Sequence, residues 1–477
     1  MQDRFAPAIA ANRFGLGARP GELADIGGDP RGWLAEQLRG PAPQVAQSGL
    51  RGSSDILAEV IELRRDQRDL RRGKRAGSGE QPGKGEANAA LVQALLKLPQ
   101  IYRPIYMNEV TARLRHAVAT DRPFLERITQ FWTNHFAVSI DKIAVLGLAG
   151  TLEREAIRPH VLGNFTDLLL SVEHHPAMLL YLDNHLSIGP TSRAARLLAR
   201  RQGGRKVGLN ENLAREILEL HTLGVDGGYT QKDVTTFAEV ITGWSIGGEG
   251  GRFNRGEPGK FVFRPEVHEP GAKTVLGKRY SQDDEAQGIA VLRDVAARPA
   301  TARFIATKLA RQFIADEPPQ EAVDHLAKAF ARSHGDLPTV YRALIDTPAA
   351  WAEPYAKYKT PNDYIVSTFR GLAQPVSSGR IGVASFELLG QRTYSPGSPA
   401  GWPDRSADWD GASALMKRIE WADAVGQRLG SHKDATDLAP DLLGESLSPD
   451  TRTAISRAAS GAQALTLMLT APEFLRR

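Results

Sequence analysis

The stretch that decides the fold class is residues 123–136, which read PFLERITQFWTNHF. Its apolar residues recur at three- and four-residue spacing, a period typical of an amphipathic α-helix. The residues that share this face are Phe124, Ile128, Phe131, Trp132 and His135. Pro123 suits the first turn of such a helix, and Asp121 is a candidate N-cap. The stretch therefore predicts a helix with one buried face.

The same period continues along the chain in both directions. It predicts helices at 22–38, 53–70, 89–96, 105–118, 146–157, 165–173, 177–182, 211–221, 232–242, 286–297, 300–314, 319–333, 337–346, 361–372, 412–429 and 454–469. A Gly-rich stretch, 247–282, breaks the pattern and contains short strand candidates at 260–264 and 273–276. We expect a mainly α, large multi-helix globular protein with a small β-hairpin insertion near 258–280. The 477 residues are expected to form one integrated domain, with a C-terminal helical portion at 283–477 and a loop at 393–406.

The absence of cysteine limits the chemistry. It excludes disulfides, Cys-ligated zinc, iron–sulfur clusters, covalently attached haem and a thiol nucleophile. A divalent transition metal, if bound, must be held by His, Asp, Glu or Asn. The apolar runs are too short for a transmembrane segment, and the start, MQDRF, lacks the features of a secretory signal. The cytoplasm is the expected location, although an exported mature chain would look the same.

The net charge of +5 comes from two local segments. Residues 64–86 hold eight basic and four acidic residues, and residues 193–206 hold six basic residues and no acidic one. The rest of the chain is therefore mildly acidic. We interpret 71–87 as a flexible basic surface loop. Basic residues are not interleaved with aromatic ones, so nucleic acid is not an expected partner, whereas an anionic small molecule or an acidic protein is.

The densest polar cluster lies at 210–224, NENLAREILELHTLG. On a straight helix Asn212, Arg215 and Glu216 share one arc with Glu219, while His221 lies on the apolar side. Glu216 and His221 can then meet only if the helix ends or bends near residue 220. The alternative interpretation is an exposed ladder of i,i+4 pairs through Glu211, Arg215 and Glu219.

Histidines near predicted helix ends suggest a metal site. His135, one of His174 and His175, and His221 could converge with a carboxylate such as Glu216 or Asp183, a donor set that suits zinc, iron or manganese. The alternative is that each is a hydrogen-bonded core histidine. The HExxH, GxSxG and GxxxxGK[ST] motifs are all absent from the sequence, which argues against the common zinc proteases, α/β serine hydrolases and P-loop proteins.

Several stretches resemble the large bacterial family catalogued as domain of unknown function 1800. They are, in order, 10–17 (AANRFGLG), 131–136 (FWTNHF), 210–225, 229–231, 242–244, 268–277, 395–403 and 471–474. The resemblance covers nearly the whole chain, but it implies no activity. The segment around Trp402 could close a pocket with Trp132 or Trp244, or it could be a loop fixed by its prolines.

From these observations we predict an enzyme with a His/Glu/Asn pocket, either a metal-dependent hydrolase or an oxidoreductase. The expected catalytic residues are Glu216, His221, His135, Asn212 and Arg215. The expected ligand-binding residues are Trp132, Asn134, Asp183, Trp244, His268 and Trp402. The expected metal ligands are His135, His175, His221 and Glu216. A metal-free version would use Glu216 or Asp183 as general base. The alternative is a non-catalytic binding or assembly protein that holds an acidic partner with segments 64–86 and 193–206.

Overall fold

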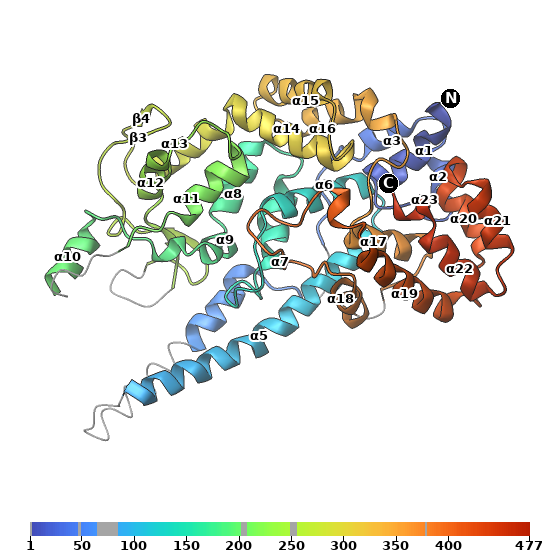
Figure 1. Ribbon diagram of the computed structural model, residues 1–477. Helices are drawn as coiled ribbons and strands as arrows, with labels where there is room; N and C mark the ends of the chain where they lie inside the picture. Colours follow the sequence, from blue (N-terminus) through green and yellow to red (C-terminus); the bar gives the residue numbers. More distant parts are fainter. Residues whose placement is uncertain (1, 46–48, 64–83, 202–207, 249–254, 377–378) are drawn as a thin grey trace.

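The computed structural model describes residues 2–45, 49–63, 84–201, 208–248, 255–376 and 379–477 (Figure 1). The fold is mainly helical, as predicted, and its described strands form two small antiparallel sheets. The α-helices of the first half are α1 Ala6–Ile9, α2 Glu22–Ile26, α3 Pro30–Glu36, α5 Lys84–Ala119, α6 Pro123–His135, α7 Ala149–Thr151, α8 Phe165–Glu173, α9 Pro176–Tyr181, α10 Arg193–Arg201, α11 Asn212–Glu216 and α12 Gln231–Val240.

The second half continues with helices of ordinary length. They are α13 Glu285–Ala296, α14 Pro299–Phe313, α15 Gln320–Arg332, α16 Leu337–Asp346, α17 Pro361–Gly371, α18 Gly379–Leu388, α19 Ala412–Leu429, α20 Ala435–Leu443, α21 Pro449–Ser456, α22 Gly461–Thr470 and α23 Pro472–Leu475. In the described part of the chain, π-helical segments interrupt this regular pattern at η2 Ala10–Phe14, η3 Leu152–Ile157 and η6 Ile217–Thr222. Such segments are rare and often occur at functional sites.

The first and last helices lie together at one end of the molecule (Figure 1). Helices α8 to α13 and the strands form the other end, and α6 lies between the two ends. The last residues pair with 357–359, where the Lys359 N–H donates to the Leu475 carbonyl (2.9 Å) and the Arg477 N–H to the Lys357 carbonyl (2.8 Å). Buried side chains from Ile9 to Leu475 form one hydrophobic cluster. The central position of α6 thus places its residues between both ends of the chain.

Some predicted helix bounds are wrong for local reasons. The helix expected at 22–38 is broken into α2 and α3 by Gly27, whose φ of 37° leaves the helical region. The helices expected at 89–96 and 105–118 are one helix, α5, although Pro99 and Pro104 lie inside it. Arg122, not Asp121, immediately precedes α6, and Asp121 pairs with Arg19 instead (2.7 Å).

The strands pair differently from the prediction. The expected strands at 260–264 and 273–276 both exist, as β2 Phe261–Phe263 and β3 Lys273–Val275, but they do not pair with each other. β2 pairs with β1 Trp244–Ile246, and β3 pairs with β4 Lys278–Tyr280. The two residues between β3 and β4, Leu276 and Gly277, both have positive φ, which is the geometry of a two-residue hairpin turn.

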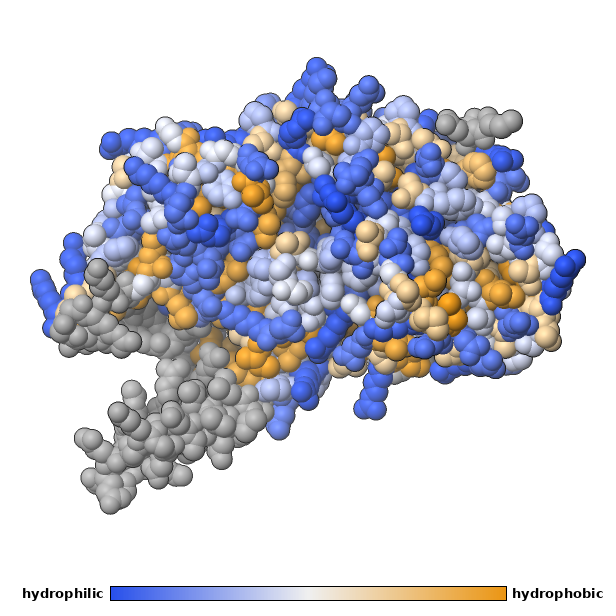
Figure 2. All heavy atoms as spheres, viewed as in Figure 1, coloured by the Kyte–Doolittle hydropathy of each residue, from blue (hydrophilic) through white to orange (hydrophobic). Residues whose placement is uncertain are grey.

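The predicted basic segments are only partly described. Residues 71–83 of the loop expected at 71–87 lie outside the described residues. Residues 202–206 of the second basic segment also lie outside them. Arg193, Arg196 and Arg200 of α10 are exposed. Figure 2 shows that polar side chains cover most of one face of the molecule, with smaller apolar patches between them. None of the described helices is long and apolar enough to cross a membrane.

Candidate active site

A cavity of about 120 Å³ opens between α6, α14 and the segment 391–404. Its lining includes Gln130, Asn134 and His135 from α6, Lys308 from α14 and Trp402 from segment 391–404. Three of these, His135, Asn134 and Trp402, are residues that the sequence predicted for the site. Gln130 and Lys308 are not.

His135, the last residue of α6, is almost completely buried. Its Nε2 lies 3.1 Å from the main-chain carbonyl oxygen of His221, so this nitrogen must carry a proton and donate it. Nδ1 is buried and has no partner among the described residues. Burial, together with the charge of Lys308, holds the pKa of His135 well below its usual value. His135 is therefore a neutral imidazole with a free acceptor nitrogen.

Lys308 is a half-buried cation without a counter-ion in the described part of the chain. Its Nζ lies 5.7 Å from the ring centroid of Phe304, one helical turn earlier on α14. The His135 ring lies 6.2 Å from the same phenyl ring, so both titratable groups lie beside Phe304. Burial lowers the pKa of Lys308 to about 8, although Asp404 acts in the opposite direction. Asp404 itself pairs with Arg311 (3.6 Å).

The position of Phe304 depends on Gly224. This glycine has a φ of 82°, and a Cβ placed on it would lie 2.7 Å from the Phe304 ring. Any side chain at residue 224 would therefore displace the ring that both His135 and Lys308 approach. The glycine at the end of the 210–224 cluster thus has a structural role in the cavity.

Asn134 holds segment 391–404 over the cavity. Its Nδ2 donates to the Trp402 carbonyl oxygen (2.9 Å), and its Oδ1 accepts from the Trp402 N–H (2.7 Å). The chain can come this close only because residue 401 is glycine: its φ is 86°, and a Cβ there would clash with the Asn134 carbonyl oxygen. Trp402 therefore closes the cavity against Asn134, and not against Trp132 or Trp244.

Gln130 presents a second unpartnered atom. Arg113 donates to Asn362 Oδ1 (3.3 Å), which orients the Asn362 amide so that its Nδ2 donates to Gln130 Oε1 (2.9 Å). Gln130 Nε2 is then a buried donor with no partner among the described residues. The cavity thus has one unused donor, one unused acceptor and one unpaired cation among the described residues, which are the features of a binding site for a polar ligand.

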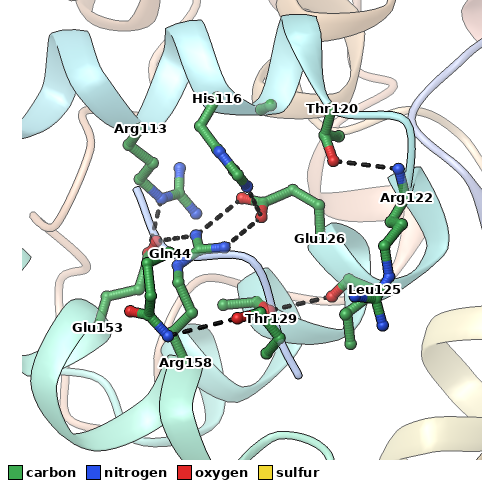
Figure 3. A network of polar contacts seen from close by, with 12 residues as sticks. Gln44, Arg113, His116, Thr120, Arg122, Leu125, Glu126, Thr129, Glu153 and Arg158 are labelled. Carbon is green, nitrogen blue, oxygen red and sulfur yellow. Dashed lines mark hydrogen bonds and ion pairs between the residues drawn. The ribbon is translucent and has the colours of Figure 1, made fainter. Parts of the chain in front are cut away.

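A buried ionic network lies behind one wall of the cavity (Figure 3). Arg158 contacts Glu126 through both terminal nitrogens (2.5 and 3.0 Å) and also contacts Glu153 (2.8 Å). Glu153 accepts in addition from Arg113 (2.7 Å) and from the hydroxyl of Tyr394 (3.2 Å). Burial alone would raise the pKa of Glu153, but the two guanidinium groups outweigh it and lower the pKa. This network holds Arg113 and Tyr394 in the cavity wall.

The predicted bend in the 210–224 cluster is present as the π-helical segment η6. Its i→i+5 hydrogen bonding changes the angle between Glu216 and His221 from that of a straight α-helix. Burial raises the pKa of Glu216, and the charge of His221 counteracts this rise, so the two groups interact. His221 Nδ1 lies 2.7 Å from Glu173 Oε1, and both side chains are almost completely buried. Glu173 thus orients His221, whose carbonyl in turn orients His135.

The four expected metal ligands do not meet. His175 Nε2 lies 3.2 Å from Glu155, and its Nδ1 accepts from the Ala177 N–H, so both of its nitrogens are engaged elsewhere. Across the described residues, no group of three or more His, Asp or Glu is arranged to hold a metal ion. Of the set His135, His175, His221 and Glu216, the cavity lining contains His135, and His221 contacts it through its main-chain carbonyl.

The remaining predicted site residues lie outside the cavity lining. Trp132 and Trp244 are fully buried in the core, and the Trp132 indole donates to the Tyr341 hydroxyl (2.7 Å). Asp183 pairs with Lys142 (2.6 Å), and His268 Nδ1 contacts the Thr242 carbonyl (2.9 Å). Asn212 begins α11.

Arg215 is engaged in surface contacts. It pairs with Glu211 (3.2 Å) and also donates to the side-chain oxygen of Gln231, the first residue of α12 (2.9 Å). Of the alternative ladder through Glu211, Arg215 and Glu219, the Glu211–Arg215 pair is present on partly exposed side chains, whereas Glu219 accepts from the Tyr229 hydroxyl (3.1 Å).

Comparison with known proteins gives one match. The model of the family described as "Protein of unknown function (DUF1800)" matches residues 9–476. The chain belongs to this family. No curated protein and no solved structure matches the chain. Three stretches on which the resemblance rested, 131–136, 210–225 and 395–403, contribute His135, Gly224 and Trp402 to the cavity or its support.

Sequence reasoning missed Lys308, Gln130 and Glu173. Lys308 lies at the edge of the apolar face of a predicted helix, where a lysine usually extends into solvent. Gln130 lies in the stretch 123–136, but a single glutamine carries no signal. Glu173 directly precedes the two histidines at 174 and 175, and its contact with His221 bridges 48 residues.

Proposed function

We propose that the chain is an enzyme that moves protons on a small anionic substrate bound in the cavity between α6, α14 and segment 391–404. The observation that carries this proposal is that neutral His135 and cationic Lys308 lie beside the same phenyl ring. Among the described residues, His135 Nδ1 has no hydrogen-bond partner and Lys308 has no counter-ion. Titratable groups whose environments shift their pKa values in this way are typical of acid–base catalysis.

The roles follow from the hydrogen bonds. His135 Nδ1 accepts a proton from the substrate or from a water molecule, because Nε2 is committed to the His221 carbonyl. The ammonium group of Lys308 attracts the negative charge of the substrate and stabilises charge that develops during the reaction. His135 thus takes the place of Glu216 or Asp183 as the general base of a metal-free mechanism.

The proposal is tested with a panel of small carboxylic acids, hydroxy acids, 2-oxo acids and their methyl esters in D₂O, followed by proton NMR. We expect the wild-type protein to hydrolyse, convert or deuterate at least one compound. His135→Gln should lower that rate by about 10² to 10⁴, the usual contribution of a general base. Lys328→Met, which changes an exposed lysine on α15, serves as the control and should keep the wild-type rate. Equal rates for wild type and His135→Gln on every compound would overturn the proposal.

A second candidate function, binding of an acidic partner, is favoured by α10. Arg193, Arg196 and Arg200 are exposed, and none forms an ion pair with another described residue. The test is binding of poly-L-glutamate to the wild-type protein and to the triple variant in which these arginines are replaced by serine. We expect salt-sensitive binding that the triple variant loses. Unchanged binding would contradict this function.

A further inference from the structure

We propose that Lys308 is a nucleophilic amine that forms a Schiff base with a small carbonyl-bearing anion, of the 2-oxo acid class, held in the cavity. This inference rests on the proposed function, because it places the reacting substrate in the same site. It adds the class of substrate and a covalent step that acid–base chemistry alone does not require.

The surroundings of Lys308 favour a reactive amine. Its Nζ approaches the ring of Phe304 instead of a carboxylate, and the acidic residue whose charge acts on it, Asp404, pairs with Arg311. Burial favours the neutral form of a lysine, and it outweighs the attraction of the phenyl ring for the ammonium group, so Lys308 loses its proton more easily than a solvated lysine. With a pKa of about 8, about one tenth of Lys308 is uncharged at pH 7, against less than about 0.1% of an ordinary lysine. The neutral amine is the form that attacks a carbonyl carbon.

His135 supplies the proton transfers that the step needs. The Lys308 nitrogen attacks the carbonyl carbon and passes one proton to His135 Nδ1, which delivers it to the carbonyl oxygen, so that a neutral carbinolamine forms. The nitrogen then passes its second proton to His135 Nδ1, and His135 delivers it to the hydroxyl, which leaves as water while the carbon–nitrogen double bond forms. The balance is one amine plus one carbonyl giving one imine plus one water, so no oxidant, reductant or further reactant is needed.

The other end of the ligand is specified by Gln130. Asn362 and Arg113 hold the Gln130 amide in place, and its Nε2 has no acceptor among the described residues. A carboxylate oxygen of a ligand would be a suitable acceptor. Gln130 and Lys308 both line this cavity of about 120 Å³. A carbonyl carbon at Lys308 and a carboxylate within reach of Gln130 together describe a small 2-oxo acid.

The chain contains a built-in control for this chemistry. Lys359 has an even lower pKa, about 7, because burial removes it from water. It is 1% exposed, its Nζ contacts the Ser367 hydroxyl (3.1 Å) and lies 4.2 Å from the Phe474 ring centroid, and it does not line the cavity. Both lysines have a lowered pKa, but only Lys308 lines the cavity. Comparing their reactivity therefore shows whether a lowered pKa is enough or whether access to the cavity is also needed.

The experiment is reductive trapping of the full-length protein with glyoxylate and cyanoborohydride at pH 7, followed by peptide mass mapping. We expect one carboxymethyl group at Lys308, formed at least ten times faster than at an average exposed lysine, and none at Lys359. Lys308→Met should abolish the rapid modification and Lys328→Met should leave it unchanged. His135→Gln should slow it at least tenfold, and added acetate should compete with it.

Three results would overturn the inference: modification of Lys308 no faster than that of exposed lysines, equal modification of Lys308 and Lys359, or no effect of His135→Gln. Circular dichroism confirms that each variant is folded. If trapping fails while conversion of a small anion still depends on His135 in the NMR assay, the Schiff base is excluded and the proposed function stands. If that conversion is absent as well, both proposals fail.

Discussion

The ionic network around Arg158 and the cavity beside it both place charged groups away from water, but they do so in opposite ways. In the network Arg158 contacts two carboxylates, and Glu126 and Glu153 each have further partners. In the cavity Lys308 has no counter-ion and His135 Nδ1 has no hydrogen-bond partner among the described residues. Desolvated charge is expensive unless it is paired. The pairing in the network therefore stabilises the fold, whereas the unpaired groups in the cavity destabilise it until a ligand provides partners for them.

The largest expected effect comes from removing the centre of the network. Arg158→Met leaves Glu126 and Glu153 buried with fewer partners, and we expect it to lower the free energy of unfolding by about 3–5 kcal/mol. Urea unfolding followed by circular dichroism measures this loss. Arg39→Ala, which breaks an exposed pair with Glu36, is the control and should change stability by less than about 1 kcal/mol. If Arg158→Met lowered the free energy of unfolding by as little as Arg39→Ala does, the ionic network would not be the stabilising region that the comparison with the cavity assumes.

The next effect tests the cover of the cavity. Asn134→Ala removes both hydrogen bonds to the Trp402 main chain, each worth about 0.5–1.5 kcal/mol, so we expect a loss of about 1–3 kcal/mol. Amide hydrogen exchange should accelerate in segment 391–404 and remain unchanged in α15. Unaltered exchange in segment 391–404 would show that its prolines, and not Asn134, hold it in place.

Lys308→Met should change stability in the opposite direction. Removing an unpaired, half-buried cation from a functional site should raise the free energy of unfolding by about 0.5–2 kcal/mol at pH 7. The pKa of Lys308 is lowered from 10.5 to about 8 on folding, so the unfolded chain binds more protons between these values. The advantage of the variant should therefore be full below pH 8 and fade as the pH rises toward 10.5. Destabilisation by Lys308→Met at pH 7 would show that Lys308 is paired in solution.

The smallest effect is expected at the surface of the 210–224 cluster. Arg215 is partly exposed and contacts Glu211 and Gln231, so Arg215→Ala should cost only about 0.3–0.5 kcal/mol. The NMR assay should detect no change in turnover. A loss of turnover comparable to that of His135→Gln would place Arg215 in the reaction and extend the active site beyond the cavity.

Much of the fold and part of the site could be predicted. The helical period identified α6, α14 and most other helices, because burial of one face imposes that spacing locally. The break at Gly27 is local, because the positive φ of this glycine ends α2, and the helical period alone did not show it. The single helix across Pro99 and Pro104 and the pairing of β1 with β2 could not be predicted, because they depend on packing against distant residues. His135, Asn134 and Trp402, which stand in distinctive motifs and were proposed from the sequence, line the candidate cavity, whereas Lys308 and Gln130 carry no local signal.

The sequence by itself determined the mainly helical class, the exclusion of cysteine chemistry, the family and the segments that surround the cavity. Only the tertiary structure decided which side chains line the cavity together. His135 and Lys308 are 173 positions apart in the sequence, yet both line the cavity and lie near Phe304. His175 does not line the cavity, and its Nε2 contacts Glu155. The spacing of apolar residues can be read from a few consecutive residues of the sequence, whereas the pKa of a side chain depends on every group that folding brings close to it.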